Sequence, residues 1–225
     1  MKKRIICLLS IICICIVGVG VFTIFASATE GQSPLYALGQ FFKTANNEST
    51  KNDYVVMAKY NGTDITSTVV NYQRNANVIR NESAAAENKS DLDIINNIIE
   101  NLILLEEAER LGLSATEAEI ESLMQSAKVG YSIPEGKKII DDFCEGAGIS
   151  YEEYLEIYRN QLPRTIARQK LLDAVGKQFC EANGLMFTKV NPPKEMVAAQ
   201  ELYIQELFEK NKDKIEYYFD IPELS

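Results

Sequence analysis

The chain has 225 residues, of which 46% are hydrophobic, so it can bury one sizeable core once any targeting segment is subtracted. Its formal net charge is -9, and Lys2, Lys3 and Arg4 precede the first apolar run, so the rest of the chain is more acidic still. Because no basic cluster follows residue 4, we do not expect nucleic-acid binding. The absence of histidine excludes Ser-His-Asp and Cys-His catalysis and the common zinc sites.

Residues 1–28 have the pattern of an export segment. A basic start is followed by an uncharged run, Ile5 to Phe25, and then by Ala26-Ser27-Ala28, which resembles a signal-peptidase site. The run is longer than that of a typical signal peptide and long enough to span a bilayer. We therefore expect an uncleaved membrane anchor, with a cleaved signal peptide as the alternative. The charges before the run place the N-terminus inside and the remaining chain outside the membrane.

Residues 29–53 are expected to form a flexible spacer, because the last ten of them are polar. The alternative is a short amphipathic turn at the membrane surface. Its apolar side would consist of Leu35, Tyr36, Leu38, Phe41 and Phe42.

The folded domain is predicted to cover residues 54–225 and to begin with a short strand, Tyr54 to Tyr60. This stretch is rich in β-branched and aromatic residues, and Asn61-Gly62 follows it as a turn signal. Apolar residues at helical spacing then predict a first helix from about Thr66 to Arg80. These residues are Val69, Tyr72, Ala76 and Ile79.

A buried central helix is predicted between Ser90 and Gly112. Ser90 and Asp93 approximate a capping box at its start, and Gly112 is the matching stop. Isoleucines and leucines occupy more than one face, whereas a surface helix keeps a single apolar stripe. Other elements must therefore pack on two sides of this helix.

Two shorter helices are predicted next, Ser114 to Ala127 and Glu135 to Glu145, with a loop through Gly130 and Pro134 between them. The motif SATE at residues 114–117 reads as a capping box. The expected inward residues are Ile120, Leu123, Met124, Ala127, Ile139, Ile140 and Phe143, and the expected stop signals are Gly146 and Gly148. The carboxylates Glu117, Glu119 and Glu121 fall on mixed faces and indicate a solvated surface, not a catalytic site.

The longest helical pattern runs from Ser150 to Asn183, and Pro163 predicts a kink at residues 159–163. A break at Leu185 to Pro193 separates it from a last helix, Lys194 to Asn211. The chain then offers a second strand, Lys214 to Phe219.

The two predicted strands are expected to pair, because a lone strand cannot satisfy its backbone groups and the chain has few other β-rich runs. Val55 or Val56 and Ile215 or Tyr217 would then face the central helix. Lys59 and Glu216 would point to solvent.

The sequence therefore predicts a mainly α fold. It is a helical bundle around a central buried helix, with one long kinked helix and a small two-stranded sheet joining the N- and C-terminal strands. No metal or cofactor site is predicted. Cys144 and Cys180 are expected to be free core thiols, with a disulfide as the alternative, while Cys7, Cys13 and Cys15 lie in the apolar run.

Four segments in order carry a family resemblance: VVMAKYNGTDIT, EEAERLGLSATEAEIE, GAGISYEEYLEIYRNQL and YIQELFEKNKDKIEYYF. Residues 55–219 resemble the N-terminal chaperone module of the SurA and PrsA group of exported peptidyl-prolyl isomerases and foldases. The isomerase domain of that family is missing, since only residues 185–193 stand where it would be inserted. The resemblance implies the chaperone part without the enzyme.

A chaperone holding unfolded chains needs adaptable apolar surface. The candidate polypeptide-binding residues are Tyr131, Tyr151, Tyr154, Tyr158, Phe179, Met186 and Phe187. Ordinary packing is the favoured interpretation for Tyr154, Tyr158 and Phe179, and exposed contacts for Met186 and Phe187. The leading hypothesis is a membrane-tethered extracytoplasmic chaperone that binds unfolded or newly exported polypeptide through an apolar groove. The alternative is an adaptor ectodomain that docks one folded envelope partner.

Overall fold

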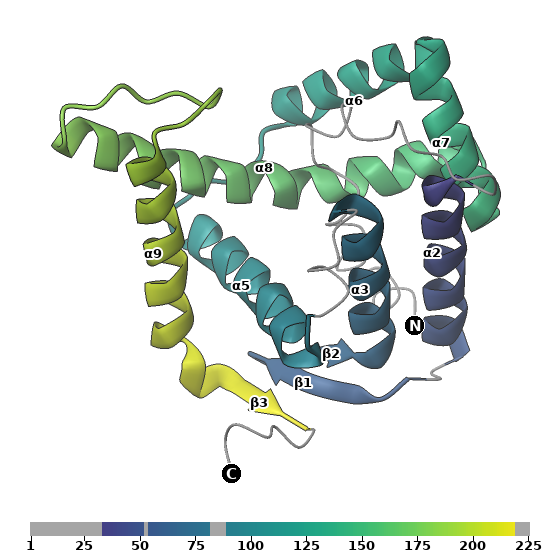
Figure 1. The fold of residues 1–225 in the computed structure, drawn as a ribbon, viewed down its shortest axis with the longest axis horizontal. Helices are drawn as coiled ribbons and strands as arrows, with labels where there is room; N and C mark the ends of the chain where they lie inside the picture. The colour runs from purple at the N-terminus through teal and green to yellow at the C-terminus, as the bar shows by residue number, and fades with distance from the viewer. Residues whose placement is uncertain (1–32, 52–53, 82–88, 219–225) are drawn as a thin grey trace.

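The computed structural model describes residues 33–51, 54–81 and 89–218, which fold into a mainly helical structure with a small antiparallel sheet (Figure 1). The predicted export segment lies outside these residues. None of the described helices is both long enough and apolar enough to cross a bilayer.

The helices and strands follow in chain order with short connections. They are α2 Pro34–Lys51, β1 Val56–Tyr60, β2 Thr63–Thr66, α3 Ser67–Asn81, α5 Asp91–Arg110, α6 Glu117–Ser132, α7 Pro134–Ala147, α8 Tyr151–Ala182, α9 Lys194–Lys210, the 3-10 turn η3 Lys212–Lys214 and β3 Ile215–Tyr217.

Helix α5 is the buried central helix that the sequence predicts. Ser90 and Asp93 form a complete capping box, in which the Asp93 backbone N–H donates to Ser90 Oγ at 3.1 Å and the Ser90 backbone N–H donates to the Asp93 carboxylate at 3.0 Å. Helices α3, α8 and α9 and strand β1 all contact α5. The side chains that they bury include Ile94, Ile95, Ile98, Ile99, Ile103 and Leu104.

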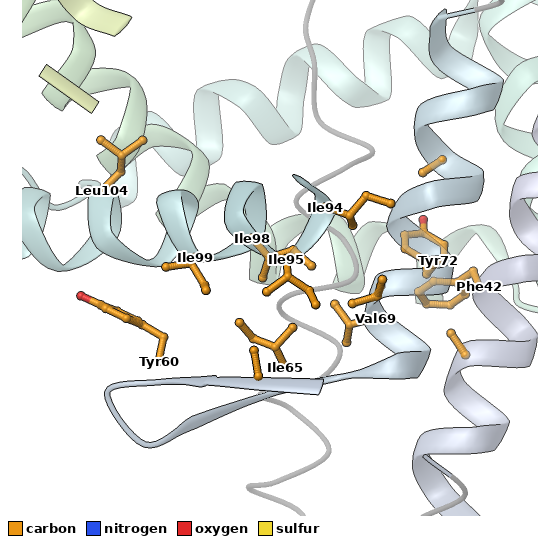
Figure 2. Packing of buried hydrophobic residues seen from close by; sticks show 14 of the residues in the cluster. Phe42, Tyr60, Ile65, Val69, Tyr72, Ile94, Ile95, Ile98, Ile99 and Leu104 are labelled. Carbon is orange, nitrogen blue, oxygen red and sulfur yellow. The ribbon is translucent and has the colours of Figure 1, made fainter. Parts of the chain in front are cut away.

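The sheet has three strands in the order β2-β1-β3, so the predicted two-stranded sheet is wrong. Asn61 and Gly62 both have positive φ, at 45° and 78°, and turn the chain directly back into β2. Ile65 on β2 is fully buried and points toward α5 with its neighbours in Figure 2. Asp64, next to it, is exposed and pairs with Lys59 at 3.3 Å. The sequence analysis had assigned this short segment to the approach to the first helix.

The predicted pairing of the N- and C-terminal strands is confirmed. Lys59 lies opposite Glu216 in the β1–β3 register. Ile215 and Tyr217 pack against the core, and the Tyr217 hydroxyl donates to Asn96 Oδ1 on α5 at 2.6 Å. Of the two valines proposed to face the central helix, Val55 is 68% exposed. The inward-facing residues of β1 are therefore Val56, Ala58 and Tyr60, of which Ala58 and Tyr60 are buried.

The expectation of a flexible spacer at residues 29–53 is wrong for residues 34–51, which form helix α2. Leu38, Phe42 and Ala45 lie at helical spacing on one face and are buried in the core. The Phe42 ring packs edge-to-face on Tyr72 of α3 with a centroid distance of 6.3 Å, and these two side chains lie together in Figure 2. Phe42 is therefore used for internal packing, whereas its neighbour Phe41 remains 37% exposed.

Helix α2 lies against α7 with direct contact between their backbones. A Cβ atom placed on Gly39 of α2 would lie 2.3 Å from the Phe143 carbonyl oxygen. A Cβ atom placed on Gly146 of α7 would lie 2.0 Å from the Tyr36 carbonyl oxygen. Only glycine fits at either position, because both obstacles are backbone atoms.

Both boundaries of α6 differ from the sequence prediction. The capping box of α6 is formed by Thr116 and Glu119, two residues after the predicted start. Helix α6 continues through Gly130, and only Ile133 separates it from α7. Helix α8 runs without interruption across Pro163, and the kink predicted at residues 159–163 stays a prediction. Cys144 and Cys180 are both buried and free, as predicted.

We expect Gly146→Ala to destabilise the protein by about 3 kcal/mol or more, because overpacking against backbone forces the two helices apart. Chemical denaturation monitored by circular dichroism measures this change. Gly130→Ala is the matched control, since a Cβ atom there meets nothing within 4 Å, and helix propensity favours alanine by up to about 1 kcal/mol. Equal unfolding midpoints for the two variants would contradict the backbone contact.

Removal of β3 tests the joining of the two ends of the chain. Truncation after Asn211 is expected to lower the free energy of unfolding by several kcal/mol relative to truncation after Tyr218, because Ile215 and Tyr217 leave the core and the edge of β1 loses its partner. The comparison uses the denaturant midpoints of the two truncated chains. Coincident midpoints would show that β3 contributes nothing to the fold.

Candidate functional site

Four of the predicted polypeptide-binding tyrosines form one stacked row. Tyr131 stacks on Tyr151 with a centroid distance of 3.7 Å, Tyr151 on Tyr154 at 6.3 Å, and Tyr154 on Tyr158 at 6.2 Å. The three tyrosines of α8 follow at spacings of three and four residues, which places them on one helix face. Their rings cover one another, so this row fastens the end of α6 to α8.

The outer face of Tyr131 is also occupied. The Lys137 ammonium lies 5.0 Å from its ring centroid, and its hydroxyl donates to Asp141 Oδ1 at 2.9 Å. Burial raises the pKa of the Tyr151 hydroxyl, which has no hydrogen-bond partner among the described residues. The four tyrosines are half-buried, and much of their ring area is used in contacts with one another and with Lys137.

The remaining predicted contact residues lie at the C-terminal end of α8 and in the loop after it. Met186 is 81% exposed and Val190 is 77% exposed, while Leu185 is also accessible. Phe187 is half-buried with the Lys177 ammonium 5.5 Å from its ring centroid, and Phe179 is half-buried on α8. The loop at 185–193 thus presents separate apolar side chains, of which Met186 is the most accessible.

The structure contains a cleft of about 360 Å³ between α5, α8 and the β1–β2 hairpin. Its volume lies in the range of small-ligand and side-chain sites. The apolar part of the lining consists of Leu102, Leu105, Ala115, Pro163 and Ala167. The polar part consists of Tyr60, Thr63, Glu106, Glu109, Ser114 and Arg164. The sequence analysis expected an apolar groove without placing it, and this cleft lies beside the long helix α8.

One face of α5 forms the first wall of this cleft. Leu102, Leu105, Glu106 and Glu109 follow at the spacing i, i+3, i+4 and i+7, which brings them to one side of a helix. The Glu106 carboxylate accepts hydrogen bonds from the Tyr60 hydroxyl at 2.7 Å and from Asn61 Nδ2 at 2.8 Å. Burial and the nearby carboxylate raise the pKa of Tyr60, so this hydroxyl stays a donor.

The second wall is the middle of α8, which carries Pro163, Arg164 and Ala167. Figure 1 shows α8 crossing the end of α5. Arg168 donates to Asn101 Oδ1 on α5, and Lys170 Nζ donates to the Ser114 carbonyl at 2.9 Å. These bonds set the distance between the two walls. Pro163 has no backbone N–H, so the Arg159 carbonyl does not accept the helical hydrogen bond that another residue at position 163 would donate.

Most acidic side chains near the cleft are paired. Arg159 binds both Glu117 and Glu121, and Lys170 binds Glu119 at 2.7 Å. Lys170 and the cap contacts with Thr116 lower the pKa of Glu119 to about 2. The three carboxylates that the sequence analysis assigned to a solvated surface therefore hold α6 against α8. No cluster of potential metal ligands occurs among the residues that the structure describes.

The sequence analysis missed the residues of the α5 wall. The signal was present, because acidic residues replace apolar ones on a single face of α5 at Glu106 and Glu109. The opposing wall lies more than fifty residues further along the chain, and nothing local reveals that the two faces meet.

Comparisons of this chain with protein-family models, with curated proteins and with solved structures gave no match.

A matched pair of variants tests the stacked tyrosine row. Tyr131→Phe should cost about 1 kcal/mol, because the hydrogen bond to Asp141 is lost while the ring remains. Tyr151→Phe should change stability by less than about 0.5 kcal/mol or increase it, because its hydroxyl is enclosed without a partner. Denaturant midpoints of both variants give the difference. A larger loss for Tyr151→Phe would show that its hydroxyl is bonded.

Proposed function

We propose that this chain is an extracytoplasmic chaperone or folding factor, tethered to the membrane through Ile5 to Phe25, that binds unfolded or newly exported polypeptide. The observation that carries the proposal is the cleft between α5 and α8. It combines an apolar floor with fixed polar groups, as a site for extended chain segments requires. The resemblance of residues 55–219 to the SurA and PrsA chaperone module supports the same role.

The loop at 185–193 offers a second accessible apolar surface, at the C-terminal end of α8. Met186 and Val190 expose flexible or compact apolar side chains at the end of α8. A thioether side chain adapts to varied partners, because it has several rotatable bonds and a polarisable sulfur. We propose that clients meet the loop and the cleft, and that the protein acts without isomerase activity.

Suppression of aggregation by the full-length chain tests this function. We expect Leu105→Gln to reduce the protection of two unrelated denatured proteins by at least about half, because it places a polar group on the floor of the cleft. Light scattering at a fixed ratio of protein to client is the readout. Val129→Gln is the matched control, since Val129 is 53% exposed and does not line the cleft.

Two results would contradict the proposal. One is wild-type protein that protects neither client. The other is a Leu105→Gln variant that folds normally by circular dichroism and protects as well as Val129→Gln. Saturable binding to one folded envelope protein without protection of denatured clients would favour an adaptor ectodomain.

A further inference from the structure

The cleft between α5 and α8 contains two carboxylates that form no ion pair within the described part of the chain. Glu106 accepts hydrogen bonds only from the neutral groups of Tyr60 and Asn61 among its described contacts, so its charge is held in place and not cancelled. Glu109, one turn further on the same face, forms no ion pair with a described residue. Both side chains line the cleft.

Several other acidic side chains near the cleft form ion pairs with described cations. Glu107 points to another face of α5, where Arg110 pairs with it at 2.6 Å and the Tyr203 hydroxyl donates to it at 3.1 Å. On α6, Glu119 binds Lys170, while Glu117 and Glu121 share Arg159. Glu106 and Glu109 differ from these four glutamates, because each of the four has a described cationic partner.

The remaining charge in the cleft lies on the opposite wall. Arg164 lies on α8, and Lys170 on the same helix binds Glu119 and the Ser114 carbonyl. The apolar floor consists of side chains that belong to both walls, including Leu102 and Leu105 of α5 and Ala167 of α8. An occupant thus meets two carboxylates on the α5 side, one guanidinium on the α8 side and apolar side chains on both.

We infer that the cleft selects extended polypeptide segments in which a lysine or arginine lies next to an apolar side chain. The cationic group would face Glu106 and Glu109, and the apolar side chain would cover the floor. The Glu106 carboxylate, which Tyr60 and Asn61 already hold, loses little conformational freedom on binding. This inference rests on the proposed function, because it names the segments that the same cleft prefers.

Fluorescence anisotropy with the full-length chain and three labelled peptides tests the inference. The peptides share their length and their leucine and alanine positions and carry lysine, glutamine or glutamate at the same sites. We expect the lysine peptide to bind about tenfold more tightly than the glutamate peptide, with the glutamine peptide between them. Added salt should narrow this range, because exposed charges are screened.

Two variants with equal net charge separate the cleft from the whole acidic protein. Glu109→Gln should reduce the preference for lysine over glutamate by at least about threefold and leave the affinity for the glutamine peptide unchanged. Glu201→Gln, an exposed residue of α9, removes the same charge outside the cleft and should leave the preference intact.

Equal affinity for all three peptides would overturn the charge preference while leaving the chaperone proposal standing. An equal loss in both variants would also overturn it, since the preference would then come from net charge. Absence of binding by every peptide, together with absence of protection in the aggregation assay, would remove the proposed function as well.

Discussion

Burial of α5 on two sides is the constraint on which the rest of the structure depends. Its isoleucines occupy more than one face, so the sheet with α3 and the pair α8 and α9 must each cover part of it. Each fully buried aliphatic side chain contributes about 1.5–3 kcal/mol relative to exposure, and α5 supplies several of them. The three-stranded sheet would be marginal alone, and it is stable because Ile65 and Tyr60 close onto this helix.

The same helix creates the cleft, because only part of its length is covered. Towards its C-terminal end α5 replaces apolar residues by Glu106 and Glu109 on the face toward the middle of α8. Two carboxylates there cannot be packed against an apolar helix face without a large desolvation cost. The crossing is instead held by polar contacts to its sides, through Arg168 and Lys170. An accessible space with an apolar floor is the result.

Local signals allowed much of this fold to be predicted, and tertiary contacts account for the rest. The starts of α5 and α8 follow from capping boxes at Ser90 and Ser150, which are short-range interactions. Strand β2 was missed because it has four residues and leads directly into α3. Helix α2 was missed because its polar face has the composition of a linker. The apolar residues on its other face do follow at helical spacing in the sequence. The two walls of the cleft are distant in sequence, so their meeting could not be predicted.

The tyrosine row shows why residue type alone is a weak guide to a binding surface. Tyr151, Tyr154 and Tyr158 share one face of α8, and that spacing suits either a client or a neighbouring helix. In the structure Tyr131 of α6 stacks on Tyr151, so this face contacts a neighbouring helix. The Lys137 ammonium lies near the Tyr131 ring. Aromatic area that is already covered gains little from a further partner, since no more surface leaves water. The cleft between α5 and α8 differs from the tyrosine row, because it keeps apolar side chains next to Glu106 and Glu109, which form no ion pair with a described residue.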